Sequence, residues 1–261
     1  MPIFNGGRIG SNNDPTISLA SGLWTGLEQC DAVRREIWPV SIVTDGLVLN
    51  LDAGDSASYP GSGTTWYDLS GNGNNGTISG ATYSSNESGY LDFDGVNDYV
   101  NCGTTNLSSG TSLTVEVWVK PGTTQNAYSD ILDYDHGGTG DKGFVIQQNN
   151  TSTNQYYFAY WNGTTYDVTS TVTIGTSSFN HLVFTKSGTS VVGYLNSQNT
   201  LNYTGSSTIY CSGRTLHIGR FVSGSGREFN GNISSVKIYN KALTSSEITQ
   251  NYNALKGRYG L

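Results

Sequence analysis

The residue types best suited to chemistry gather in one segment, DLSGNGNNG, at positions 68–76. A hard cation such as calcium is held by carboxylate, amide and backbone oxygens from a tightly curled loop. The glycines at positions 71 and 73 allow that curl. The segment is therefore a candidate calcium loop. Hydrogen bonds from Asn and Asp side chains to the loop backbone are an alternative explanation for the same residues.

Catalytic carboxylates are harder to find. Hydrolysis of a glycosidic bond needs two carboxylates at a defined separation. In the segment LTVEVWVK, Glu116 is followed at the same-face positions by Trp118 and Lys120. Glu116 is therefore predicted to be a solvent-side strand residue, and the chain is expected not to be an enzyme. A partner from a distant loop, such as Asp133 or Asp135, stays open.

Histidine and cysteine spacing adds no catalytic or metal motif. The histidines lie far apart and lack HExxH spacing, so His181 and His217, in expected strands, are predicted to be structural. The spacing of Cys30, Cys102 and Cys211 excludes CxxC motifs. Cys102 and Cys211 are predicted to be buried free thiols, although a disulfide between them stays open.

Aromatic side chains offer a second kind of chemistry, because the C–H faces of sugars stack on exposed rings. The candidates for such a glycan-binding face are Tyr134, Tyr160, Trp161, Tyr166 and Tyr210. The alternative is that Trp161 belongs to the core and that the tyrosines are ordinary strand residues.

Short alternating segments separated by Gly, Ser and Asn turns predict β-strands throughout residues 46–239. Ser187-Gly188-Thr189 predicts a tight hairpin. Many strands with almost no helix predict an all-β, two-sheet antiparallel jelly-roll sandwich. The expected strands are Leu47–Asp52, Gly89–Phe93, Asp98–Asn101, Leu113–Lys120, Gly143–Gln148, Tyr156–Trp161, Asn180–Lys186, Val191–Leu195, Leu216–Gly219 and Ile233–Tyr239.

Helical spacing occurs only near the two ends. Residues 1–45 contain a short amphipathic helix that Pro39 ends, and it is too short to form its own core. These residues are predicted to form an assembly arm, because buried aromatics are the usual anchors of interfaces. Near the C-terminus, Thr244 and Glu247 predict a capping box, and Gly257 predicts the helix stop. The expected anchors of the arm are Trp24, Leu27 and Trp38.

Composition excludes several classes of protein. The net charge is −7, which disfavours binding to nucleic acid. Hydrophobic residues make up 35% and charged residues 13% of the 261 residues, and no window approaches the roughly 20 apolar residues of a membrane span. The N-terminus lacks the basic-then-apolar pattern of a signal peptide. We therefore expect a protein made in a cytoplasm, without membrane insertion.

Five segments stand out in order along the chain: WYDLSGNGNNGT, YLDFDGVNDYV, LTVEVWVKP, HLVFTKSGTSVVGYLN and LHIGRFVSGSGREFNGNISSVKIYNKALTSSEI. Together they resemble the laminin-G/concanavalin A-like family over about residues 46–256. The resemblance implies a sandwich domain at 46–261 and a structural calcium ion with Asp68 as a ligand, to which our prediction adds Asn72. Relatives often place an acid in the last strand, where Ser234 and Ser235 stand here, so a weaker site is expected.

The N-terminal segment GLWTGLEQCDAVRREIWP is similar to leader segments of structural proteins in tailed phages. With a lectin-like domain, it implies a virion surface protein, either a head decoration or a tail-fibre component. Such a protein would assemble as a homo-oligomer with other virion proteins and could contact cell-surface glycan. A dedicated carbohydrate-binding adhesin is the alternative, and a glycoside hydrolase is disfavoured because Glu116 lacks a partner.

Overall fold

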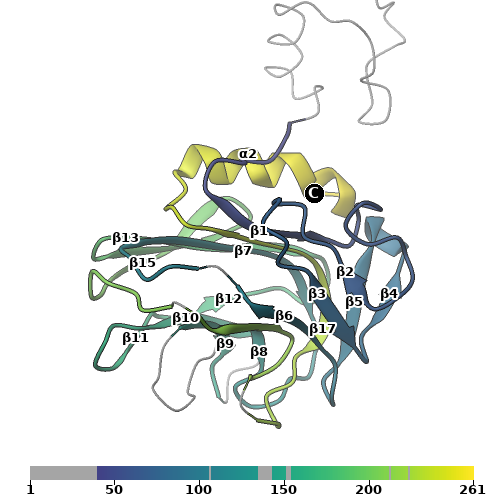
Figure 1. The fold of residues 1–261 in the computed structure, drawn as a ribbon, viewed down its shortest axis with the longest axis horizontal. Coiled ribbons are helices and arrows are strands. Elements are labelled where there is room, and N and C mark those ends of the chain that lie inside the picture. The colour runs from purple at the N-terminus through teal and green to yellow at the C-terminus, as the bar shows by residue number, and fades with distance from the viewer. Residues whose placement is uncertain (1–39, 106, 135–142, 151–153, 212, 223) are drawn as a thin grey trace, which may run out of the picture.

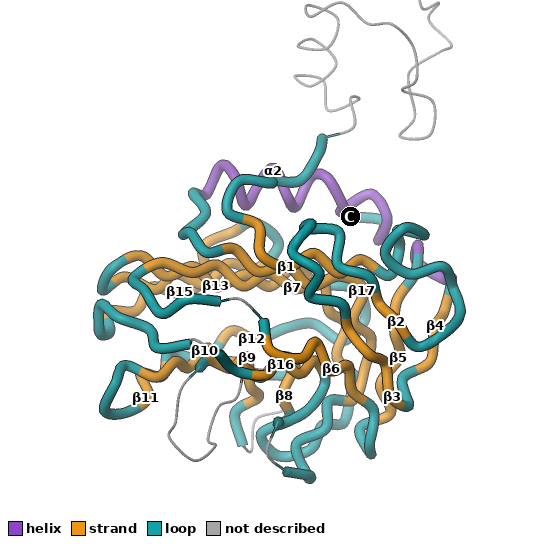
Figure 2. The backbone as a smooth tube through the Cα atoms, in the orientation of Figure 1, coloured by secondary structure: helices purple, strands orange, loops and turns teal. Residues whose placement is uncertain are grey.

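The computed structural model describes residues 40–105, 107–134, 143–150, 154–211, 213–222 and 224–261. Two antiparallel β-sheets stack face to face, and a C-terminal helix lies across the outer side of one of them (Figure 1, Figure 2). The predicted all-β sandwich with a C-terminal helix is confirmed. Residues 1–39, which include Trp24, Leu27 and Trp38, lie outside the described part, so the assembly helix stays a prediction.

Sheet A has eight strands in the order β15-β14-β13-β7-β17-β5-β4, with β1 also paired to β17. β1 and β5 share one edge of β17, because β1 pairs with residues 235–239 and β5 with residues 230–233. The strands are β1 (Leu47–Asp52), β4 (Thr82–Ser84), β5 (Tyr90–Asp94), β7 (Ser112–Pro121), β13 (Asn180–Ser187), β14 (Ser190–Leu195), β15 (Gln198–Thr204) and β17 (Asn230–Tyr239).

Sheet B has nine strands in the order β11-β10-β9-β8-β16-β6-β3-β2, with β12 also paired to β10. Its strands are β2 (Thr65–Trp66), β3 (Gly76–Ser79), β6 (Tyr99–Thr104), β8 (Asp130–Tyr134), β9 (Phe144–Gln148), β10 (Gln155–Trp161), β11 (Tyr166–Val168), β12 (Val172–Thr173) and β16 (Thr215–Ile218). A short 3-10 turn, η1 (Asn86–Ser88), precedes β5.

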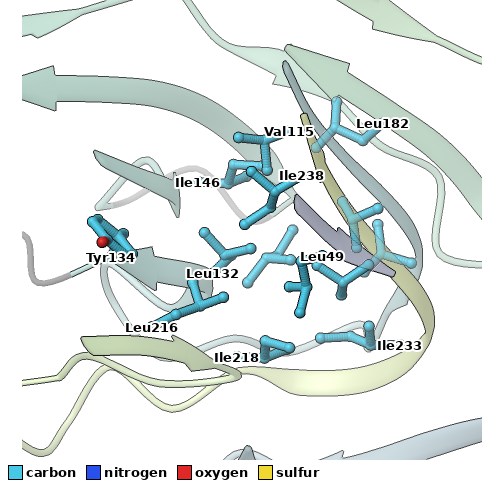
Figure 3. Close-up of a cluster of buried hydrophobic side chains, with 14 of the residues drawn as sticks. Leu49, Val115, Leu132, Tyr134, Ile146, Leu182, Leu216, Ile218, Ile233 and Ile238 are labelled. Atoms are coloured by element: carbon cyan, nitrogen blue, oxygen red, sulfur yellow. The ribbon is translucent and has the colours of Figure 1, made fainter. Parts of the chain in front are cut away.

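The hydrophobic core fills the space between the sheets (Figure 3). Sheet B contributes a row of buried side chains that are in register across five strands: Phe158, Ile146, Leu132, Ile218 and Val100. Sheet A faces this row with Leu49, Val115, Leu182, Ile233 and Ile238. Alternation along each strand sends one set of side chains inward, so the other set must form the outer faces.

Cys102 and Cys211 are both buried and free, so the free-thiol prediction is confirmed. Burial raises the pKa of both thiols, that of Cys211 to about 12. Both therefore remain protonated and act as small apolar side chains.

Every strand that the sequence predicts is present within a few residues, and Gly188 forms the predicted hairpin with φ 55°. The structure adds β8, whose sequence DILDY carries two acids, and the polar strand β15 at the edge of sheet A. It also adds the two- to four-residue strands β2, β3, β4, β11 and β12. These segments lack a clear alternation of apolar and polar residues, because they are short, lie near sheet edges or bury acids.

The C-terminal helix α2 (Ser245–Leu255) begins with the predicted capping box, in which Thr244 and Glu247 bond each other's backbone N–H. The α-helix ends where it was predicted to end, with Lys256 as its C-cap and Gly257 next, but Gly257 does not adopt the left-handed conformation of a glycine cap. A 3-10 turn, η2 (Lys256–Tyr259), continues the helix, and Gly260 ends it in the left-handed region with φ 70°. Within the described ranges, no helix combines the length and the apolar character needed to cross a bilayer.

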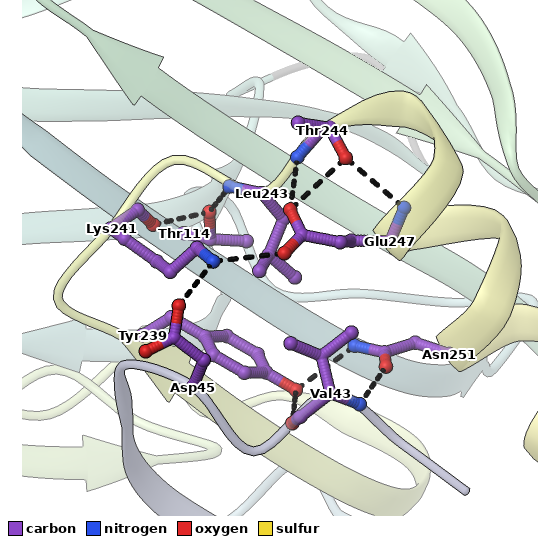
Figure 4. Close-up of polar contacts among 9 residues, drawn as sticks. All are labelled: Val43, Asp45, Thr114, Tyr239, Lys241, Leu243, Thr244, Glu247 and Asn251. Atoms are coloured by element: carbon purple, nitrogen blue, oxygen red, sulfur yellow. Dashed lines mark hydrogen bonds and ion pairs between the residues drawn. The ribbon is translucent and has the colours of Figure 1, made fainter.

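Residues 41–45 pack on the sandwich, although the sequence assigned them to the N-terminal arm. Val43 is buried against α2, and its N–H donates to Asn251 Oδ1 at 2.8 Å (Figure 4). The hydroxyl of Tyr239 donates to the Val43 carbonyl at 3.1 Å, and Asp45 forms an ion pair with Lys241. The boundary expected between residues 45 and 46 is therefore corrected: the described chain packs on the domain from Ser41, which accepts a bond from Gln250.

Glu116 is fully buried beneath α2 on the outer face of sheet A, so its predicted solvent exposure is wrong. Asn251 Nδ2 donates to Glu116 Oε2 at 2.6 Å. Lys237 Nζ lies 3.7 Å from Oε1, and His181 Nε2 lies 3.2 Å from it without the alignment of a hydrogen bond. Burial alone would raise the pKa of Glu116, but His181 and Lys237 outweigh it and lower the pKa to about 2. Glu116 is thus a buried carboxylate neutralised by its neighbours.

A stack of aromatic rings completes the contact between α2 and sheet A. Trp118, two residues after Glu116 on β7, stacks on His181 at 4.9 Å, on Tyr252 at 5.7 Å and on Tyr259 at 4.4 Å between ring centroids. Aromatic pairs of this kind add roughly 1 kcal/mol each beyond their buried area. The helix and the charge cluster therefore form one interface.

We predict that Asn251→Ala lowers the free energy of unfolding by about 3 kcal/mol, because it leaves Glu116 Oε2 and the Val43 N–H buried without a partner. Asn253→Ala is the matched control, since Asn253 lies on the same helix and is only half-buried. Its effect should stay within about 0.5 kcal/mol. Urea unfolding of both variants measures the difference. Equal losses in the two variants would refute the role of Asn251.

Candidate functional site

Two of the five predicted glycan-binding aromatics are not on the surface. Tyr134 on β8 and Tyr160 on β10 are fully buried, so their prediction as exposed contacts is wrong. Tyr134 donates its hydroxyl proton to the Thr105 carbonyl at 3.2 Å, and Tyr160 donates to the Ser206 carbonyl at 2.9 Å. Both occupy the strand positions that point between the sheets, which the sequence did not reveal because their hydroxyls made either face plausible.

The other three aromatics come together at one end of sheet B. Trp161 and Tyr166 are directly opposite on β10 and β11, with ring centroids 5.1 Å apart. The backbone N–H of Tyr210 donates to the Trp161 carbonyl at 3.0 Å. Trp161 and Tyr166 are half-buried, and Tyr210 is 39% exposed. We call these three residues the aromatic cluster.

Gly163 lets the aromatic cluster close up. It lies in the turn between β10 and β11 with φ 104°, and a Cβ there would lie 2.8 Å from the ring of Tyr210. Any other residue would push that ring away, so the turn holds the three rings near one another. Such a set of partly exposed rings can stack on the apolar face of a sugar.

The outer face of sheet B is more polar than the sequence indicated. A second row in register across the same five strands contains Ala159, Val145, Asp133, His217 and Asn101. Asp133 is fully buried and His217 is 7% exposed, although both lie on the side away from the core. Residues 219–222 and 224–229 pack over the acids of β8: Val222 N donates to Asp133 Oδ2 at 2.7 Å, and Asp130 N donates to the Arg227 carbonyl at 2.9 Å.

Asp130 lies beside Asp133 and is also fully buried. Burial, and then the neighbouring Asp133 carboxylate, raise the pKa of Asp130 well above its usual range. Gln147 Nε2 donates to Asp130 Oδ1 at 2.6 Å. A carboxyl that keeps its proton in this way resembles a general acid. The sequence signal was only the DILDY segment, and Asp133 was considered only as a distant partner.

The candidate calcium loop is held by its own hydrogen bonds. Asp68 Oδ1 accepts from the N–H groups of Asn50 and Ser70, each at 2.9 Å. Asp68 Oδ2 accepts from Ser70 Oγ at 2.8 Å and from the Asn74 N–H at 2.9 Å. Four donors surround the carboxylate, so it does not fit the part of a metal ligand.

The side-chain amide of Asn72 directs its N–H groups toward β1. Its Nδ2 donates to the carbonyls of Leu47 and Val48, at 3.1 and 3.2 Å. The bonds from Asn72 and Asn74 tie the loop to β1, which explains the Asn-rich sequence without an ion. Among the described residues, no group of three or more His, Cys, Asp or Glu could hold a metal. Ser234, in the strand where relatives often place an acid, is buried and bonds Gly89 and Tyr259.

We predict that Asp68→Ala lowers the free energy of unfolding by about 2 kcal/mol, since it removes the acceptor of four hydrogen bonds. The loss should be the same in calcium and in a chelator. Asp94→Ala is the control, because Asp94 is exposed and accepts a side-chain bond from the Val96 N–H. Thermal melting with and without calcium decides: a calcium-dependent rise in Tm that Asp68→Ala abolishes would restore the metal site.

Comparisons with solved structures show the same fold at low sequence identity. Domain 4 of a GH43 extracellular arabinanase from Geobacillus stearothermophilus, in complex with arabinotriose, is 18% identical, with a TM-score of 0.59 over 79% of this chain and 98% of that domain. A Trypanosoma rangeli sialidase in complex with sialic acid is 17% identical, with a TM-score of 0.60 over 82% of this chain but 33% of the sialidase.

The binding domain of botulinum neurotoxin serotype G is 14% identical, with a TM-score of 0.58 over 79% of this chain and 50% of that one. A search of curated proteins found no match. The family model described as the concanavalin A-like lectin/glucanases superfamily matches residues 94–249, more than half of the chain. The β-strands, the sandwich and this match lead to one conclusion: the chain belongs to the concanavalin A-like lectin/glucanases superfamily.

Proposed function

We propose that this protein is a non-catalytic carbohydrate-binding domain and that the aromatic cluster stacks on the sugar. The observation that carries the proposal is the convergence of Trp161, Tyr166 and Tyr210 at one end of sheet B, with ring surface exposed. Sugar-binding sites combine such rings with a few polar groups that fix orientation. In the adjacent turn, the Thr164 N–H and hydroxyl donate to Asn162 Oδ1 at 3.0 Å each, which fixes the turn that carries the rings.

The comparisons support this proposal at the level of fold. The arabinanase domain carries arabinotriose in its solved structure, and the neurotoxin domain is a binding domain. Neither is named as a catalytic unit. A lectin-like role therefore agrees with these two structural neighbours. The choice of sugar depends on the residues of this chain.

The affinity of such a site is expected to be low. A few ring stacks and hydrogen bonds give a Kd of roughly 1 mM, which is about −4 kcal/mol. Many copies on one particle raise the effective affinity by multivalency, so a single weak site is sufficient.

The buried carboxylates argue against hydrolysis. Glu116 lies under α2 with its charge neutralised, so no substrate reaches it. Asp130 and Asp133 are buried beneath residues 219–222 and 224–229. A general acid must lie within hydrogen-bonding reach of the bond that it protonates. Neither Glu116 nor the Asp130–Asp133 pair meets that requirement while the covering elements are in place.

The proposed setting is the surface of a virion, as a head decoration or tail-fibre component. The N-terminal segment supports this setting through its similarity to leader segments of tailed-phage structural proteins. That segment would join homo-oligomers or other virion proteins through Trp24, Leu27 and Trp38. Mass spectrometry of purified particles, with copy number, tests the setting. Deletion of residues 1–39 should remove the protein from particles but leave the sandwich folded.

We predict that Trp161→Ala weakens binding of arabinotriose, the first probe, at least tenfold, because it removes the central ring of the aromatic cluster. Tyr67→Ala is the control, since Tyr67 is 46% exposed but follows β2 at the opposite end of sheet B. Nuclear magnetic resonance titration gives both affinities, followed by a glycan array if arabinotriose does not bind. The same incubations should release no reducing sugar. Equal glycan binding by Trp161→Ala and the wild type would exclude the cluster, and sugar release would exclude the non-catalytic reading.

A further inference from the structure

His217 on β16 is a buried polar side chain without a partner. It is 7% exposed, and neither of its ring nitrogens has a hydrogen-bond partner in the described part of the chain. An imidazole in this state carries one unused N–H donor and one unused acceptor. Leaving such groups unpaired costs about 1–3 kcal/mol, so the position needs an explanation. It lies on the outer face of sheet B, in the polar row, and not in the core.

Side chains from both neighbouring strands flank this ring, with Asp133 on β8 and Asn101 on β6 paired directly with His217. Tyr99 on β6 lies 5.4 Å from His217 between ring centroids and is half-buried. The guanidinium of Arg220 lies 4.2 Å from the centroid of the Tyr99 ring. Asn101, half-buried, is paired with His217 across the strands, and Thr77 beyond it is exposed. The three side chains Tyr99, His217 and Arg220 therefore lie together on the outer face of sheet B, where Tyr99 and Arg220 are half-buried and His217 is 7% exposed.

Arg220 is a cation without a carboxylate. Its Nε donates to the Phe221 carbonyl at 3.3 Å, and no described residue forms an ion pair with it. The protein carries a net charge of −7, so an unpaired guanidinium beside an unpaired imidazole is unusual on this surface. A guanidinium presents a planar fork of N–H donors that fits a carboxylate or sulfate through two parallel bonds.

The imidazole is suited to assist as a neutral group. Burial, and then the charge of Arg220, lower the pKa of His217 to about 4. At neutral pH the ring therefore carries no charge, so it donates one hydrogen bond and accepts another. An anionic group that also bears hydroxyls matches this set: the anion takes the fork, and a hydroxyl or the anion itself pairs with the ring.

We propose that Tyr99, His217 and Arg220 form a binding subsite for an anionic sugar, a glycan residue that bears a carboxylate or a sulfate ester. Stacking on the Tyr99 ring holds the Arg220 guanidinium in place. The fork of Arg220 binds the anion, and His217 bonds a hydroxyl of the sugar or the anion itself. The subsite extends the proposed carbohydrate-binding function, on which it rests, by adding a ligand class.

The subsite and the aromatic cluster lie on one sheet. His217 is three strands from Ala159, the β10 residue two positions before Trp161. Three strand spacings correspond to about 14 Å. An oligosaccharide can span that distance, so the two places can hold different residues of one chain.

Three matched probes separate the sources of the anion. Methyl glucuronide, methyl glucoside 6-sulfate and neutral methyl glucoside differ at carbon 6 alone. We expect the full-length protein to bind the glucuronide or the sulfate ester with a Kd of about 1 mM and at least tenfold more tightly than the glucoside. Chemical shifts of the His217 ring protons should move on titration. Whichever of the two charged probes binds more tightly shows whether the subsite prefers a carboxylate or a sulfate ester.

Arg220→Gln should weaken binding of the anionic probe at least tenfold, and Arg220→Lys should restore little of it, because a lysine lacks the fork. Lys120→Gln removes the same charge from the outer face of sheet A and should leave binding unchanged. Thermal melting confirms that each variant is folded.

The outcomes separate this subsite from the aromatic cluster. Loss of anionic binding in Trp161→Ala but not in Arg220→Gln overturns the subsite and leaves the aromatic cluster standing. The reverse result supports the subsite, and the arabinotriose titration of Trp161→Ala tests the aromatic cluster separately. Equal binding of charged and neutral probes, or no binding of any probe, also overturns it. Binding of free acetate or inorganic sulfate as tightly as the matching sugar would show an anion site that does not recognise sugar.

Discussion

The carboxylate of Glu116 sits at the centre of the strand that joins the two halves of sheet A, and it is fully buried on the outer face. A charge in such a place is stable only when other groups neutralise it and bond its oxygens. His181 and Lys237 come from the two strands beside it, but Asn251 comes from α2. The sheet therefore requires the helix, and the helix requires residues 41–45, since Asn251 also holds the Val43 N–H.

Closure of sheet A by α2 leaves sheet B as the face on which a ligand can be recognised. The helix, with Trp118 and its ring partners, covers the outer face of β7 and β13. On sheet B no helix of the described residues is present, and residues 219–222 and 224–229 cover only the middle. Rings and unpaired polar groups remain at both sides of that segment. The asymmetry of the sandwich thus follows from the position of the Glu116 cluster beneath α2.

In the 68–76 segment too, contacts with the rest of the fold determine what the polar side chains do. The same residues that can ligate a cation, Asp and Asn, can also accept and donate to the backbone. Here three backbone N–H groups and one hydroxyl donate hydrogen bonds to the Asp68 carboxylate, so its oxygens are already occupied. Whether a loop of this composition binds a cation or bonds the protein backbone therefore depends on the elements that pack against it. Here that element is β1.

The sequence by itself determined the strands with clear alternation, the hairpin at Gly188 and the capping box at Thr244, because these depend on contacts between residues near in the chain. It also indicated which aromatics were candidates for sugar binding, without ranking them. Tertiary structure alone decided that Glu116 and Tyr160 are buried while Tyr210 is exposed. The face that a strand turns to the core, and the element that covers its other face, depend on pairing across more than a hundred residues. Local alternation shows that two faces exist, but only the assembled sheets and α2 determine which face is closed to solvent.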